Sequence, residues 1–154
     1  MNRLLYAEAA AAADRAAMDL GIPSLVLMER AALSVVHFLD HHREQYDTDC
    51  VLAVCGPGNN GGDGAAIVRI LRERGLDARV LFVGSRDKCS AQMTQQLAIL
   101  ENIDASCVLD AAALDEVFRS FHTVMGVTNI SMRGVYETTA RKCGPVERML
   151  FVGR

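Results

Sequence analysis

The chain has 154 residues, a formal net charge of −3, 51% hydrophobic and 23% charged residues. This apolar content excludes a disordered chain, and the length suits a single domain spanning residues 1–154. The weak acidity argues against nucleic acid or an anionic membrane as a partner, and no apolar run reaches the ~20 residues that cross a bilayer. The N-terminal segment carries Glu8, Asp14 and Asp19, which a secretory signal would lack, so we expect a cytoplasmic protein, with the mitochondrion as the alternative.

Two helices are predicted before the first strand. Alanine-rich residues 6–20 predict a helix that Gly21 ends, and an apolar stripe at helical spacing predicts a second helix as far as Leu39, with Ser24 as its N-cap. Strands and helices then alternate: strands are predicted at 50–55, 78–84, 105–109 and 122–127, and helices at 64–75, 90–103 (capped by Ser90) and 111–119. This order predicts an α/β domain with a mainly parallel sheet and right-handed crossovers.

The five cysteines form no CxxC pair and no Cys/His cluster with zinc spacing. Their odd number also argues against a disulfide framework of the kind found in secreted proteins. Cys50, Cys55 and Cys107 lie in apolar runs, where a free thiol behaves as a small hydrophobic side chain. We therefore expect no metal site and no reactive site at the cysteines.

The segment between the first predicted strand and the following helix is rich in glycine. Five of the nine residues 56–64, GPGNNGGDG, are glycines, which allow a backbone to approach a ligand closely and to adopt positive φ. Ligands of open α/β sheets bind beyond the carboxyl ends of strands, where helix N-termini offer N–H groups. The segment is therefore predicted to bind a ligand.

Two common nucleotide motifs do not account for this segment. Residues 56–61 match GxGxxG, but the second strand ends in VGSR and lacks the ribose-binding acid, and no GK[ST] of a P-loop follows. Asn59, Asn60 and Asp63 add polar side chains that a simple phosphate cradle does not need. Asp63 has two alternative roles, a general acid/base or the N-cap of the next helix.

Together with LGIPSLVLME at residues 20–29, this motif resembles the YjeF N-terminal family, the NAD(P)H-hydrate epimerases, over residues 1 to about 105. The resemblance implies a Rossmann-like three-layer sandwich, often dimeric, that interconverts the R and S forms of hydrated NADH and NADPH (NADHX and NADPHX). It also implies a functional link to the NAD(P)HX dehydratase, which accepts one epimer.

The same resemblance implies roles for individual residues. Asp63 would be catalytic, and Asn60 would be a ligand of one K⁺ per subunit through its side-chain oxygen. The residues that would contact the hydrated nucleotide are Asn59, Asn60, Gly61, Gly62 and Asp63 in this motif, and Ser131, Arg133 and Gly134 at the end of a second phosphate loop.

The sequence departs from the family pattern near its C-terminus. Met125 or Gly126 stands where the family has a potassium-binding aspartate, and no aspartate follows Asp115. We therefore expect a domain that is incomplete after about residue 146, with C-terminal strands missing, a weakened potassium site and little or no epimerase activity. The alternative is a non-catalytic nucleotide-binding or scaffold domain on the same fold; a standard dehydrogenase fits less well, because the ribose acid is absent.

Overall fold

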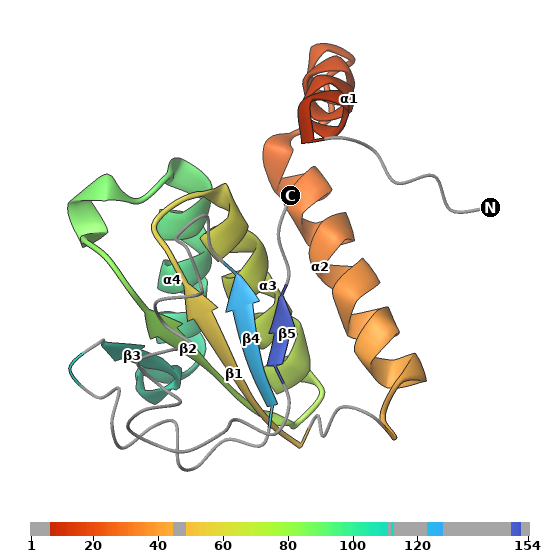
Figure 1. Ribbon diagram of the computed structural model, residues 1–154. Helices are drawn as coiled ribbons and strands as arrows, with labels where there is room; N and C mark the ends of the chain where they lie inside the picture. Colours follow the sequence, from red (N-terminus) through yellow and green to blue (C-terminus); the bar gives the residue numbers. More distant parts are fainter. Residues whose placement is uncertain (1–6, 45–48, 111, 113–122, 128–148, 152–154) are drawn as a thin grey trace.

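A computed structural model describes residues 7–44, 49–110, 112, 123–127 and 149–151 (Figure 1). Its centre is a sheet of five strands in the order β3-β2-β1-β4-β5, and every neighbouring pair is parallel. The strands are β1 (Cys50–Cys55), β2 (Asp77–Phe82), β3 (Val108–Asp110), β4 (Thr123–Val127) and β5 (Met149–Phe151). The predicted α/β class with a mainly parallel sheet is confirmed.

The chain reverses its direction of travel across the sheet at β1. From β1 it runs outward to β2 and β3, and it then returns to β4 on the other side of β1. Cys55, the last residue of β1, pairs in register with Phe82 on one side and with Val127 on the other. In open α/β sheets, the crevice at such a reversal is the usual place for a ligand.

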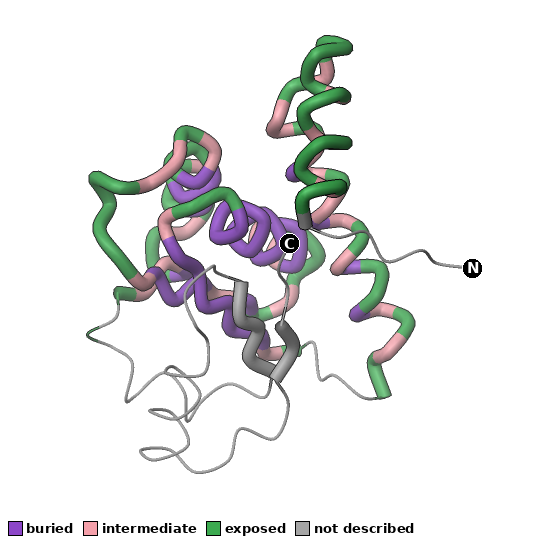
Figure 2. The backbone as a smooth tube through the Cα atoms, turned by 45° about the horizontal axis from the view of Figure 1, so that its top comes forward, coloured by how far each residue is buried: buried purple, intermediate pink, exposed green. Residues whose placement is uncertain are grey.

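Within the described residues, four α-helices accompany the sheet: α1 (Ala7–Asp19), α2 (Ser24–His41), α3 (Asn59–Glu73) and α4 (Ala91–Asp104). Helices α3 and α4 cover one face of the sheet, and α2 packs on the outer side of α3 (Figure 1). Helix α1 stands at the start of α2 and is largely exposed (Figure 2). The arrowheads of β1 and β4 and the N-terminal ends of α2, α3 and α4 therefore lie at the same end of the molecule.

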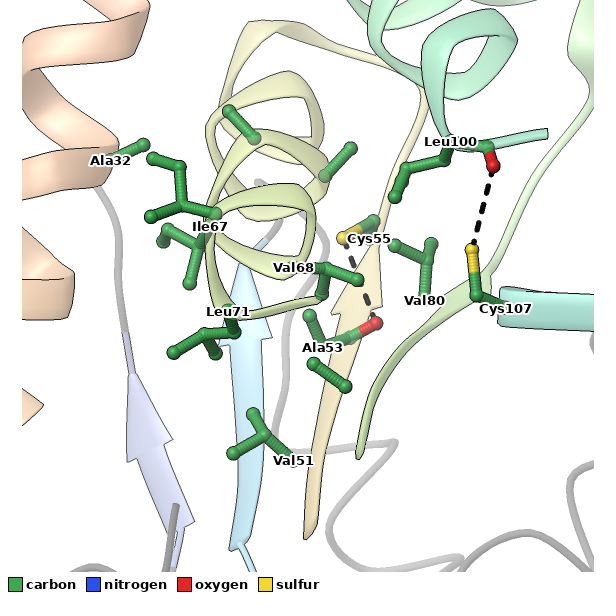
Figure 3. Packing of buried hydrophobic residues seen from close by; sticks show 14 of the residues in the cluster. Ala32, Val51, Ala53, Cys55, Ile67, Val68, Leu71, Val80, Leu100 and Cys107 are labelled. Carbon is green, nitrogen blue, oxygen red and sulfur yellow. Dashed lines mark hydrogen bonds between the residues drawn. The ribbon is translucent and has the colours of Figure 1, made fainter. Parts of the chain in front are cut away.

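The core forms on both faces of the sheet. Val51, Ala53 and Cys55 of β1 pack with Ile67 and Val68 of α3 on one face (Figure 3). The strand residues between them, Leu52 and Val54, point to the opposite face and are also fully buried. Continuous apolar strands such as CVLAVC are typical of a parallel sheet that is covered on both sides.

Helix α3 begins earlier than its sequence pattern predicts, at Asn59 instead of residue 64. The glycine-rich segment is therefore a short turn at residues 56–58 followed by helix, and none of its glycines has a positive φ. Elsewhere in the described part of the chain, Gly21, Gly75 and Gly84 have positive φ. The expected positive φ within residues 56–64 is wrong, because the chain enters α3 through an extended Gly58.

The two serine caps have different outcomes. Ser90 caps α4 by accepting a hydrogen bond from the Met93 amide at 3.1 Å, as predicted. Ser24 does not cap α2, because Pro23 occupies the N-cap position and the Ser24 hydroxyl instead accepts a hydrogen bond from Gln92 Nε2 at 2.7 Å. This second bond ties the start of α2 to the start of α4.

Some predictions fall on residues that the structure does not describe. Apart from residue 112, the helix expected at 111–119 lies outside the described residues, as does most of the segment after 127. No helix within the described ranges is long and apolar enough to span a bilayer.

Candidate functional site

The turn from β1 into α3 forms the centre of the candidate site. It connects Cys55, at the strand's carboxyl end, to Asn59, the first residue of the helix. Backbone bonding of α3 begins with the Gly62 amide donating to the Gly58 carbonyl at 3.1 Å. The amides of the first helical turn point toward this end of the sheet, and the positive end of the helix dipole favours an anion there.

Two glycines of the motif lie against other parts of the chain. A Cβ on Gly61 would lie 1.8 Å from the Gly56 carbonyl oxygen, a backbone atom, so the first turn of α3 packs directly on the turn before it only with glycine at this position. A Cβ on Gly62 would lie 2.7 Å from Met28 Cε, the end of a flexible side chain that can shift.

Gly58 is different. A Cβ at this position would meet no heavy atom within 4 Å. The residue is the N-cap of α3, with φ −83° and ψ −175°, an extended conformation that other residues also adopt. Among the described residues, nothing therefore requires glycine here, and the space over Gly58 is where a ligand can approach the backbone.

Asn60 and Asp63 are both buried, with exposed fractions of 8% and 6%. Asp63 lies one turn inside α3, and Gly58 holds the capping position, so the N-cap role considered for Asp63 is wrong. Burying a carboxylate costs free energy, and such groups concentrate at functional sites. This burial favours the chemical role of Asp63 over a purely structural one.

Asp63 lies close enough to Cys55 to influence its ionisation. Burial, and secondarily the charge of Asp63, raise the pKa of the Cys55 thiol far above its ordinary value. The thiol donates a hydrogen bond to the Ala53 carbonyl at 3.6 Å. Cys55 is therefore a protonated, inert core side chain, as the apolar run predicted.

The structure brings one group of the predicted site residues together at the start of α3: Asn59, Asn60, Gly61, Gly62 and Asp63. The predicted phosphate-loop residues Ser131, Arg133 and Gly134 lie outside the described residues. Strand β4, which leads toward that loop, lies beside β1, with Met125 opposite Ala53 and Gly126 opposite Val54.

The described residues fit a potassium ion only in part. Asn60 offers an amide oxygen, the kind of donor that K⁺ accepts. Met125 and Gly126, the nearest equivalents of the family's aspartate, have no side-chain oxygen. Within the part of the chain that the structure describes, no cluster of three or more His, Cys, Asp or Glu side chains could hold a metal.

A pocket of about 360 Å³ opens beside Asn59, and no sequence motif predicts it. Its walls come from α1, from the starts of α2 and α4 and from the first residue of α3. Four helices that are far apart in the sequence form it, so no single motif marks it.

A larger pocket of about 420 Å³ lies between α2, α3 and α4, away from the turn at residues 56–58. Arg69 lines it and makes ion pairs with Glu29 and, at 2.7 Å, with Glu73. Because these charges bind one another, we assign no ligand to this pocket.

Comparison with known proteins identifies relatives of this chain. Residues 24–123 match the family described as YjeF-related protein N-terminus. The NAD(P)H-hydrate epimerase of Levilactobacillus brevis is 44% identical over 80 residues, covering 52% of this chain and 36% of the relative. The NAD(P)H-hydrate epimerase of Oenococcus oeni is 39% identical over 108 residues, which cover 70% of this chain and 51% of the relative. The chain thus spans about a third to a half of the length of these two relatives.

The fold is also that of a solved structure. The crystal structure of the yeast protein ynu0 superposes with a TM-score of 0.76 at 20% sequence identity, covering 99% of this chain and 69% of the yeast chain. At this identity the likeness concerns the fold alone.

Proposed function

The chain belongs to the family of YjeF-related protein N-termini, and from that membership we propose that it is an NAD(P)H-hydrate epimerase-like domain, an isomerase acting on NADHX and NADPHX. The observation that carries the proposal is the buried Asp63, held one turn inside α3 at the point where the sheet reverses. Asn59, Asn60, Gly61 and Gly62, which are proposed to contact the nucleotide, belong to the same first turn of α3.

The start of α3 is proposed to bind the pyrophosphate. Its first-turn amides face the carboxyl ends of β1 and β4, and the space over Gly58 admits a ligand to the backbone. Replacing Gly58 by serine keeps a good N-cap but places a side chain in that space. We expect Gly58→Ser to weaken ADP-ribose binding by about tenfold, equivalent to ~1.4 kcal/mol, without lowering stability.

Amide chemical shifts measured during an ADP-ribose titration test this placement directly. The proposal expects the largest shifts at residues 58–65. Shifts confined to other segments would contradict it.

Asp63 is proposed as the acid/base. Epimerisation inverts the carbon of the hydrated ring that carries the added hydroxyl. A carboxyl group can give a proton to the departing hydroxyl and then take one from water that returns on the opposite face. Removing such a group typically lowers a rate by about 10²- to 10⁴-fold.

The catalytic assay combines R-NADPHX with an S-specific dehydratase and follows loss of the R form. We expect turnover to be weak, because β4 offers no carboxylate at Met125 or Gly126. Asp63→Asn should lower the enzyme-catalysed turnover, measured above the spontaneous rate, by ~10²-fold or more. The urea midpoint of unfolding should remain that of the wild-type chain. Equal turnover by wild type and variant would refute the role of Asp63.

Asn60 is proposed as the side-chain ligand of a weak potassium site, and no step of the reaction is assigned to the ion. Its amide oxygen suits K⁺, but the described residues supply few other donors. If the ion binds, KCl should raise the unfolding temperature more than choline chloride of equal ionic strength, and Asn60→Ala should abolish that difference. An equal effect of the two salts on the wild-type chain would refute the assignment.

The second candidate function is a non-catalytic nucleotide-binding or scaffold domain. The observation that favours it is the absence of an acidic residue in β4, where the family places its aspartate. ADP-ribose binding without turnover above the spontaneous rate would support this candidate over the epimerase.

The remaining proposals concern the domain and its surroundings. We propose that residues 1–154 belong to a single domain of the family's type and that the protein acts in the cytoplasm or the mitochondrion. A homodimer is proposed and is tested by light scattering of the purified chain. The functional partner is the dehydratase that consumes one epimer, which the coupled assay probes.

A further inference from the structure

The pocket beside Asn59, called the α1 pocket below, has walls that suit an uncharged aromatic group. Met18 of α1 and Leu27 and Met28 of α2 form its apolar side. Methionine and leucine provide a flat, polarisable surface on which a planar ring can lie. Its volume of about 360 Å³ is near the lower end of the range of about 300–1,000 Å³ for small-molecule sites. It therefore suits half of a dinucleotide better than the whole.

The polar side of the α1 pocket is organised before any ligand binds. Gln92 donates to the Ser24 hydroxyl at 2.7 Å, which fixes the amide plane. That bond uses one of the two amide hydrogens and leaves the carbonyl oxygen of Gln92 as an acceptor. Fixed donors and acceptors of this kind recognise the polar edge of a base.

The α1 pocket borders the proposed pyrophosphate site at Asn59. Asn59 is both a wall of the pocket and the first residue of α3, whose amides face the phosphates. A dinucleotide has its two nucleosides on opposite sides of its pyrophosphate. If the reactive ring lies toward Asp63, at the end of β1, the other nucleoside extends toward the α1 pocket.

Charge in the α1 pocket indicates which nucleosides it accepts. Asp14 is the one charged residue among the described residues that line it. A carboxylate can accept a hydrogen bond from a ribose hydroxyl, as the acid of dinucleotide-binding folds does, but it repels a phosphate at the same position. A 2′-phosphate carries roughly −1.5 to −2 charges at neutral pH.

We propose that the α1 pocket binds the adenosine half of the nucleotide and that Asp14 selects against a 2′-phosphate, so the site prefers NADHX to NADPHX. This inference rests on the proposed function, because it places the adenosine relative to the pyrophosphate at α3. It assigns roles to Asp14, Ser24 and Gln92 that the motif at residues 56–64 does not contain.

The test measures binding of three probes to the purified chain by calorimetry. 5′-AMP and adenosine 2′,5′-bisphosphate differ only in the 2′-phosphate, and nicotinamide mononucleotide reports the other half of the site. The 2′-phosphate carries one to two negative charges and would lie a few ångströms from the Asp14 carboxylate in a site open to water. Their repulsion should make 5′-AMP bind about tenfold more tightly than the bisphosphate.

Three variants locate the effect. Asp14→Asn should bring the affinities for 5′-AMP and the bisphosphate to within about twofold of each other, since it removes the repelling charge. Asp19→Asn, on the same helix but outside the pocket, is the matched control and should leave the tenfold ratio in place. Gln92→Ala should weaken 5′-AMP by about fivefold, near 1 kcal/mol, and leave the mononucleotide unaffected.

The outcomes separate this inference from the proposed function. Equal affinities of 5′-AMP and the bisphosphate for the wild-type chain would overturn the inference, as would a tenfold ratio that Asp14→Asn does not change. If the mononucleotide and ADP-ribose still bind in those cases, the proposed function stands. If neither binds, both are overturned. Thermal unfolding of each variant confirms that it is folded when titrated.

Discussion

Replacing Gly61 by alanine tests how the turn between β1 and α3 is built. The added Cβ would lie 1.8 Å from the Gly56 carbonyl oxygen, where real Cβ atoms stay beyond 3.0 Å. Both atoms belong to the backbone, so the first turn of α3 must move by about 1 Å relative to β1, at a cost near the upper end of the range for overpacking, about 3 kcal/mol. Alanine returns about 1 kcal/mol through its better helix propensity.

The net loss is therefore about 2 kcal/mol, less than the 5–15 kcal/mol that stabilises a typical domain, so the variant should fold. With an m-value of ~2 kcal/mol/M, its urea midpoint should fall by about 1 M. Gly58→Ser is the matched control three residues away, where a Cβ meets no heavy atom within 4 Å, and its midpoint should stay within about 0.3 M of wild type. Equal midpoints for Gly61→Ala and the wild-type chain would refute the packing argument.

Three other perturbations have defined outcomes. Met28→Ala should cost about 2–5 kcal/mol in urea unfolding, because Met28 is 4% exposed and packs on Gly62, whereas Met18→Ala, at a position 42% exposed, should cost ~0.5 kcal/mol or less. The hydrogen bond from Arg74, partly offset by desolvation, lowers the pKa of Asp40. The ionised Asp40 therefore stabilises the fold at pH values above the ordinary carboxyl pKa, and this stabilisation is lost as the pH falls through the lowered pKa of the folded state. In unfolding measured as a function of pH, the stability difference between Asp40→Asn and the wild-type chain should vanish below that lowered pKa. Iodoacetamide should label the partly exposed Cys89 in the native chain before the buried Cys55, as mass spectrometry would show; equal labelling rates would contradict the burial of Cys55.

The strands could be predicted from sequence because their signal is strong. CVLAVC at 50–55 is a continuous apolar run, and a parallel strand buried on both faces produces that pattern. The next strand, at 77–82, differs from its predicted range by one or two residues at each end. These strands are recognised by their burial, and a run of consecutive apolar residues indicates burial even when the tertiary contacts are unknown.

The start of α3 could not be predicted in the same way. Asn59, Asn60 and two glycines have low helix propensity, so their pattern resembles a loop. Tertiary packing decides otherwise, because the first turn lies on the Gly56 carbonyl and against Met28. The same reasoning explains the Ser24 cap: nothing local signals that its hydroxyl bonds to Gln92, 68 residues later.

The candidate site was predictable in part, through its motif. Asn60 and Asp63 stood out as polar residues among glycines, and the structure places both at the β1–α3 junction. The α1 pocket was not predictable, because Asp14 and Gln92 come together only when four helices assemble.

Helix α3 is enclosed along most of its length, with 11 of its 15 residues buried, and it also carries Asn60 and Asp63. Substitutions in this motif therefore affect the folding of the domain as well as the chemistry. A descendant that no longer needs the reaction would still require Gly61 in order to fold, while the exposed Gly58 and Asn59 would be free to vary. A glycine at position 61 thus indicates that a relative has the same β1–α3 junction, whereas substitutions at the exposed positions 58 and 59 are the first ones expected when the function changes.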